Sequence, residues 1–300
     1  MKKTLLVLMM ALAVASCAEW AEDGYVTMED VFIDDFESPV PTKAAPLSSM
    51  PSTFVCWSYV NDGTPSYMCR ETMTQSGSVW KSALKHATIA TGTNLRYYGL
   101  GSYNSSYMTV PGYNTTWANS TLVYDCPAAS GNQGDIIVAD SGIKNGSATS
   151  ASLTFSHILC QVRIHTAFDN VPAGSVTTVN LTNVGYNGTY KFSTGAWTSV
   201  TGARTMTYTA SQTLTTASEN VQIGSDAQTM MLIPQTLPSS SQLQVRVGST
   251  TYTTSMSGVV LTKGRRVTLR IIFNATSSIS TGNDTDCAPE YDMNVEVVYE

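Results

Sequence analysis

Few residues in this sequence have the types and spacing that catalysis requires. The acidic pairs at 29–30 and 34–35 are adjacent along the chain, whereas a glycosidase needs two carboxylates that face each other across its substrate. No serine lies in the G-x-S-x-G setting that presents a nucleophile in many hydrolases, and we interpret all three histidines as structural: His86, His157 and His165. We therefore expect no catalytic residue and no enzyme activity.

The sequence also lacks complete motifs for binding a metal ion or a cofactor. Asn283, Asp284 and Asp286 have oxygens that suit calcium, but the rest of a calcium-loop pattern is missing, and an ordinary Asx-rich turn is the preferred interpretation. There is no C-x-x-C pair, no phosphate-binding loop and no dinucleotide fingerprint. We expect no metal and no cofactor.

One cysteine has a defined chemistry of its own. Residues 1–16 read as two lysines, a short apolar run and small residues, and Cys17 follows directly. This pattern is typical of a bacterial lipoprotein signal peptide: cleavage before Cys17 would free its thiol and amine for palmitate and other acyl chains. A plain secretory signal with an incidental cysteine is the alternative.

The other five cysteines are Cys56, Cys69, Cys126, Cys160 and Cys287. If Asp62–Gly63 formed a two-residue hairpin turn, Cys56 would lie opposite Cys69. A disulfide between them is then a hypothesis, although a longer loop would separate the two residues.

A single basic residue follows the first segment with strand character. Residues 25–36 are apolar and β-prone in an acidic setting, residues 39–41 read Pro-Val-Pro, and Lys43 comes next. Two interpretations stay open. The segment is either a detachable strand with a cleavage point behind it or an ordinary first strand with a surface loop.

Composition excludes some partners and favours one fold class. Charged residues make up 13% of the chain and the net charge is -6, so the chain lacks the basic patch that nucleic acid requires. Many short apolar segments are separated by Gly, Asn and Ser, which predicts an all-β protein of packed sheets. Residues 80–90 are the only candidate for a short helix, and residues 186–189 predict a hairpin turn.

The segment 153–164 predicts where the chain changes its pairing. Leu153 and Phe155 are apolar at odd positions, whereas Ile158, Val162 and Ile164 are apolar at even positions. A strand cannot bury both faces in this way without an extra residue or a passage between sheets, so we expect a bulge or kink at Ser156–His157. We place a domain boundary just before it, at residues 146/147.

Several segments together resemble the fimbrillin family, the pilus-building surface lipoproteins of Bacteroidetes. The similarity extends over nearly the whole chain, and it is carried by Cys17, the T-K-A around Lys43, DIIVA at 135–139, LTFSHILCQVRI at 153–164, YKFSTGAW at 190–197, MLIPQTL at 231–237 and LTKGRRVTLRI at 261–271. The resemblance implies two tandem transthyretin-like β-sandwich domains. They would occupy residues 17–146, with a removable first strand at 25–36 and a linker to 43, and residues 147–300.

The resemblance also implies how the protein assembles. A lipoprotein precursor on the outer membrane would be cut at Lys43 by a trypsin-like surface protease, although the family often has arginine there. A strand of another fimbrial subunit would then replace the first strand, and the fimbria would serve adhesion to host or bacterial glycans or proteins. The residues expected to take part are Val26, Met28, Val31 and Ile33 on the removed strand and Val295 and Val297 on a C-terminal donor strand at 293–299.

The sequence leaves several alternatives open. The C-terminal strand can stay paired within its own domain, and the subunit can belong to the stalk, the tip or the anchor. A surface-anchored glycan-binding lipoprotein that does not polymerise is the runner-up. It would need exposed aromatic residues on one face, and of the five tryptophans Trp57 and Trp197 are interpreted as core.

Overall fold

The computed structural model of the chain describes residues 25–34, 50–86, 89–90, 92–145, 150–166, 172–215, 219–225, 228–276 and 290–299. Across these residues the chain is 63% β-strand, with no α-helix and three short 3-10 helices, so the predicted all-β class is confirmed. None of the described segments is a helix of the length and apolarity needed to cross a membrane. Cys17, Lys43 and the Asx-rich segment 283–286 lie outside the described residues.

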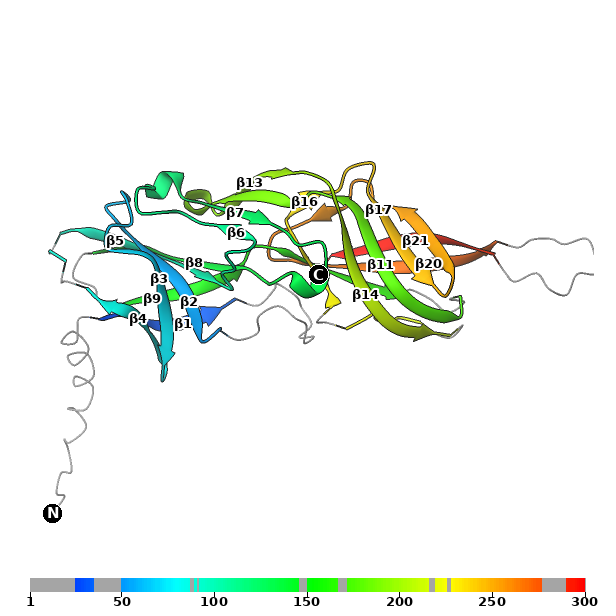
Figure 1. Ribbon diagram of the computed structural model, residues 1–300, viewed down its shortest axis with the longest axis horizontal. Helices are drawn as coiled ribbons and strands as arrows, with labels where there is room; N and C mark the ends of the chain where they lie inside the picture. The colour runs from blue at the N-terminus through cyan, green and yellow to red at the C-terminus, as the bar shows by residue number, and fades with distance from the viewer. Residues whose placement is uncertain are drawn as a thin grey trace, which may run out of the picture.

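Seven strands form one closed sheet at one end of the molecule (Figure 1). Their order around the sheet is β1 (Tyr25–Ile33), β4 (Val79–Lys85), β3 (Met68–Ser76), β2 (Thr53–Val60), β5 (Asn94–Gly101), β8 (Ile137–Asn145) and β9 (Ser150–His157). β1 closes the sheet because it pairs antiparallel with β4 on one side and parallel with β9 on the other.

The remaining strands form three four-stranded sheets and one two-stranded sheet. The first contains β15 (Met230–Leu232), β10 (Cys160–Thr166), β20 (Arg266–Thr276) and β21 (Glu290–Tyr299). The second contains β14 (Arg204–Leu214), β11 (Gly174–Val184), β17 (Gln242–Val247) and β18 (Thr250–Ser255). The third contains β13 (Ala196–Thr201), β12 (Asn187–Lys191), β7 (Thr121–Asp125) and β6 (Met108–Thr109), and the small sheet pairs β16 (Gln235–Thr236) with β19 (Val260–Leu261).

The chain passes between sheets where the apolar pattern changes parity. β9 buries its odd-numbered residues in the closed sheet and ends at His157. After Ile158 and Leu159, β10 begins at Cys160 in a different sheet. The bulge or kink expected at Ser156–His157 is not present, because both residues pair regularly with β8. The chain instead passes between sheets at Ile158–Leu159, which is the other solution to the change of parity. β9 itself follows the boundary predicted at 146/147 but pairs with β1 and β8, and that boundary stays a prediction.

Two apolar clusters fill the molecule. The smaller one lies inside the closed sheet and includes Val26, Met28, Phe54, Trp80 and Phe155. The larger cluster extends from the other face of β2 and β5 through the remaining sheets. β1 therefore contributes side chains to the smaller core, inside the closed sheet, and none to the larger core.

Two local predictions were wrong. Residues 79–85 form β4 and not the start of a helix, because the segment pairs with both β1 and β3. Asn187 and Gly188 lie inside β12 and not in a hairpin turn. Gly188 is needed for packing, since a Cβ atom there would lie 2.9 Å from the Trp197 ring.

Candidate strand-exchange site

The first strand places most of the predicted apolar residues in the core of the closed sheet. Val26 and Met28 are fully buried and Val31 is 9% exposed, whereas Ile33 is half-buried. The inward residues change from even to odd numbers because the pairing register shifts between Glu29 and Val31. A bulge of this kind inserts one extra residue, and here that residue is Asp30, with φ of 47°.

Side-chain hydrogen bonds hold both ends of β1. The Val26 N–H donates to Ser82 Oγ at 2.9 Å, at the irregularity where the β1–β4 register shifts. At the other end the Asp34 N–H donates to the Phe155 carbonyl at 2.8 Å. The Ser156 hydroxyl donates to Asp34 Oδ2 at 3.1 Å. Backbone pairing, apolar burial and these end contacts together retain the strand.

Ser82 also connects β1 to a buried acidic residue. Its hydroxyl donates to the Leu84 carbonyl at 2.7 Å, and the Leu84 N–H donates to Glu71 Oε1 at 2.7 Å. The other oxygen of Glu71 lies 2.7 Å from Nε2 of His86. Ser82 was not singled out from the sequence, because serines are abundant and its role depends on the register of β1.

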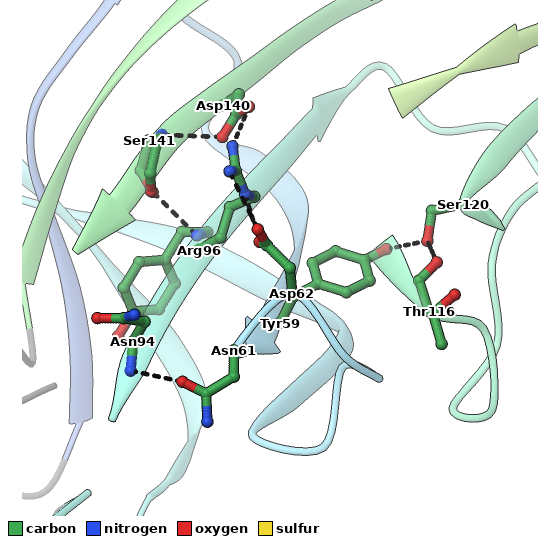
Figure 2. A network of polar contacts seen from close by, with 11 residues as sticks. Tyr59, Asn61, Asp62, Asn94, Arg96, Thr116, Ser120, Asp140 and Ser141 are labelled. Carbon is green, nitrogen blue, oxygen red and sulfur yellow. Dashed lines mark hydrogen bonds and ion pairs between the residues drawn. The ribbon is translucent and has the colours of Figure 1, made fainter. Parts of the chain in front are cut away.

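The opposite side of the closed sheet is held by charged side chains (Figure 2). Arg96 of β5 donates to Asp62 and to Asp140 at 2.8 Å each. Its guanidinium also lies 4.7 Å from the centre of the Trp117 ring. Partial burial lowers the pKa of Arg96, but the hydrogen bonds and charges of Asp62 and Asp140 outweigh that effect and raise it overall. β2, β5 and β8 therefore form a fixed frame, whereas the contacts described for β1 are mainly apolar and backbone contacts.

The predicted donor strand lies elsewhere. It is β21, which begins three residues earlier than expected and, among the described strands, pairs with β20 alone, through ten residue pairs. Val295 and Val297 are half-buried against the larger core, and Tyr299 is 55% exposed. The structure thus gathers four predicted residues on β1 but leaves the other two in a different sheet.

His86 and His157 have structural contacts. His157 Nδ1 lies 2.7 Å from Asp135 Oδ2, and the two side chains are only 3% and 2% exposed, so substrate cannot reach them. His86 lies against Glu71 and the Tyr67 ring. Within the described residues no group of three or more His, Cys, Asp or Glu side chains could hold a metal ion.

The hypothetical Cys56–Cys69 disulfide is absent. Cys56 pairs with Glu71 and both thiols are free. The turn uses Asn61 and Asp62, both with positive φ, and β3 begins only at Met68, so the loop is longer than the hypothesis required. Burial raises the pKa of the Cys126 and Cys160 thiols to about 12 and that of Cys56 still further.

Comparison with known proteins agrees with this architecture. Among solved structures, a candidate cell adhesion protein from Bacteroides ovatus matches with a TM-score of 0.60 and 15% identity, over 91% of this chain and 97% of that one. A fimbrial protein from Bacteroides vulgatus matches with a TM-score of 0.54 and 13% identity, over 90% and 98%. At these identities the likeness shows a shared fold.

A search of curated proteins finds no matching relative. The fimbrillin-like family model matches residues 59–286, a region that starts in β2 and stops just before β21. This match covers most of the chain, and the protein therefore belongs to the fimbrillin-like family.

Proposed function

We propose that this protein is a subunit of a cell-surface fimbria that is delivered as an outer-membrane lipoprotein through Cys17 and joins its neighbours by strand exchange. One observation carries the proposal: the first described strand completes a sheet and a core that six later strands build without it. Family membership supports the coarser part, a fimbrial role.

The connectivity of β1 suits a removable strand. Its sequence neighbour is β2, yet it pairs with β4 and β9. A cut between β1 and β2 would therefore break no hairpin. Since Lys43 lies in that connection, cleavage there would leave the other six strands of the closed sheet covalently continuous.

Loss of β1 would leave a site that favours another strand. The free edges of β4 and β9 would present unpaired N–H and C=O groups. The cavities left by Val26, Met28 and Val31 would be apolar, and each such side chain contributes about 1.5–3 kcal/mol when it is fully buried. An extended segment with alternating apolar residues would restore both contributions by β-strand addition.

β21 of another subunit is the proposed donor. It would give up the single ladder with β20 and would gain two neighbours, β4 and β9. Val295 and Val297 would enter the positions that the apolar residues of β1 vacate. Fimbrial subunits, the surface protease and the outer membrane are thus the expected partners, with host or bacterial surfaces as the target of adhesion.

N-terminal sequencing and mass analysis of the protein at the cell surface test delivery and activation. We expect polymers whose subunits begin at Ala44 and a precursor that begins at acylated Cys17. The alternative, a glycan-binding lipoprotein that does not polymerise, predicts only the acylated form.

A pair of lysine variants isolates the cleavage step. Lys43→Ala should leave monomers on the membrane. Lys144→Ala is the control, because Lys144 lies within the paired strand β8 and is no expected cleavage site. Normal polymers from Lys43→Ala would rule out Lys43 as the activation point.

A further inference from the structure

A polar cavity of about 410 Å³ lies away from β1, at loops that follow β5 and precede β8. Its walls come from three places along the chain that meet beside β6 and β7. The lining residues are Ser102, Asn104, Ser106, Tyr107, Met108, Tyr124, Gly131, Asn132, Gln133 and Gly134. We propose that this cavity binds a neutral saccharide, as a mono- or disaccharide unit of a larger glycan.

The lining is polar but carries no charge. It contains no Asp, Glu, Lys, Arg or His, and the chain as a whole has a net charge of -6. An anionic ligand would find no counter-charge there, and a cation would find no carboxylate. Hydroxyl and amide groups donate and accept hydrogen bonds in both directions, which matches the hydroxyl groups of a sugar.

Several of these polar groups are available to a ligand. Among the described residues, no hydrogen-bond partner occurs for the hydroxyl groups of Ser102, Ser106 and Tyr107 or for the side-chain amide of Asn132. Asn104 uses its Oδ1 to accept the Ser106 N–H at 3.0 Å, so its amide nitrogen is also available. These donors and acceptors converge on one cavity, as in a small-molecule site.

The walls are preorganised by hydrogen bonds to neighbouring loops and strands. The Tyr107 N–H donates to the Asn104 carbonyl at 3.1 Å, and the Tyr107 carbonyl accepts the Asp125 N–H at 2.9 Å. On the opposite wall, Gln133 donates to the Pro127 carbonyl and accepts the Met231 N–H, both at 2.8 Å. Fixed walls reduce the entropy lost on binding.

Tyr107 adds a surface suited to the apolar face of a sugar ring. It is half-buried, packs against the larger core and lines the cavity together with the buried Met108 and Tyr124. The tryptophans Trp57, Trp80 and Trp117 are buried in the cores and offer no such platform. Tyrosine combines an apolar ring with a polar end, which suits this role.

The experiment uses the mature full-length protein with Cys17→Ser, so that it can be studied without lipid. The probes are immobilised neutral di- and trisaccharides that end in mannose, galactose or N-acetylglucosamine, with glucuronate-terminated disaccharides as charged comparators. Binding is confirmed in solution by saturation-transfer NMR. We expect binding of at least one neutral probe and weaker binding of the charged comparators.

Two variants locate the binding in the cavity. Gly134→Phe should abolish it by filling the space, since a Cβ atom at Gly134 meets no atom within 4 Å and its φ is not positive. Gly112→Phe is the matched control, because Gly112 has the same open surroundings and does not line the cavity. Asn132→Ala removes one hydrogen-bonding group and should weaken binding about three- to tenfold.

Failure of every neutral probe to bind would overturn the proposal, and so would binding that Gly134→Phe and Asn132→Ala leave unchanged. Asn132→Ala keeps the test decisive if the bulkier variant does not fold, because the Asn132 side chain makes no hydrogen bond within the described residues. The measurement is made on monomers, so its outcome is independent of strand exchange.

Discussion

The first and last described strands both carry spaced apolar residues but have different surroundings. β1 has a neighbour on each side, and its Val26 and Met28 are fully buried. β21 has one neighbour among the described strands, and its Val295 and Val297 are only half-buried. The two strands therefore differ in position: among the described strands, β1 completes a core, and β21 lies at the edge of its sheet.

This difference explains why strand exchange would favour movement of a strand from the edge position of β21 into the two-sided position of β1. A strand in the β1 position satisfies backbone groups on both edges, whereas a strand in the β21 position satisfies one. Movement of an edge strand of one molecule into the vacated groove of another increases the number of paired backbone groups. The predictions below alter one of the two strands at a time, beginning with the largest expected effect.

Removal of β1 should expose the core of the closed sheet and leave the other core intact. A specific protease site is placed at Lys43, the chain is cut, and β1 is separated from dilute monomer. Cys56 shares a cluster with Val26 and Met28, whereas Cys126 and Cys160 belong to the larger core. Labelling with a thiol reagent and mass mapping should show Cys56 becoming reactive.

The uncut protein is the control, in which Cys69 should be the most reactive of the four described thiols because it is partly exposed. If Cys56 stays protected in the cut monomer, or if Cys160 reacts equally fast, β1 is not the closing strand of a separate core.

Truncation of a β1 core residue should be more damaging than truncation of a β21 residue. Met28→Ala should lower the free energy of unfolding by about 2–5 kcal/mol. Val297→Ala should lower it by about 1 kcal/mol, because the side chain is already half-exposed. Denaturant unfolding monitored by tryptophan fluorescence measures both. Equal losses would mean that burial does not distinguish the two strands.

Loss of the Ser82 hydroxyl should weaken the retention of β1. Ser82→Ala removes the group that accepts the Val26 N–H, and an unsatisfied buried donor costs about 1–3 kcal/mol. Hydrogen exchange at Val26 measures the effect. Ser76→Ala at the exposed end of β3 is the matched control and should change little; slow exchange in both variants would show that Ser82 does not hold the strand.

The smallest effect is expected at the charged pair on β21. Glu296 lies 2.7 Å from Arg270, and both side chains are substantially exposed. Glu296→Gln should change the free energy of unfolding by less than about 1 kcal/mol, since exposed ion pairs contribute little. Asn294→Ala is the control on the same face, and a large loss from Glu296→Gln alone would show that β21 is held more by charge than by packing.

Prediction from the sequence succeeded where a residue pattern restricts the structural solutions. The change of parity between Phe155 and Ile158 requires an extra residue or a passage between sheets, and the structure has the passage in place of the expected bulge or kink. Prediction failed where the strands that pair are far apart in the sequence. The Asn187–Gly188 dipeptide suits a turn, but both residues lie in β12, which pairs with β7 and β13. Glycine is required at position 188 because the Trp197 ring packs too close for a side chain.

The amino-acid sequence by itself determined the strand character of the chain, the all-β class and the family, because alternation and turn residues are local properties. Only the tertiary structure decided that β1 lies between β4 and β9, that Asp30 bulges so that both even and odd residues of β1 face inward, and that β21 stays at an edge. The physical reason is that strand order and register depend on hydrogen bonds and packing between residues far apart in the sequence, and each strand taken alone is compatible with many neighbours.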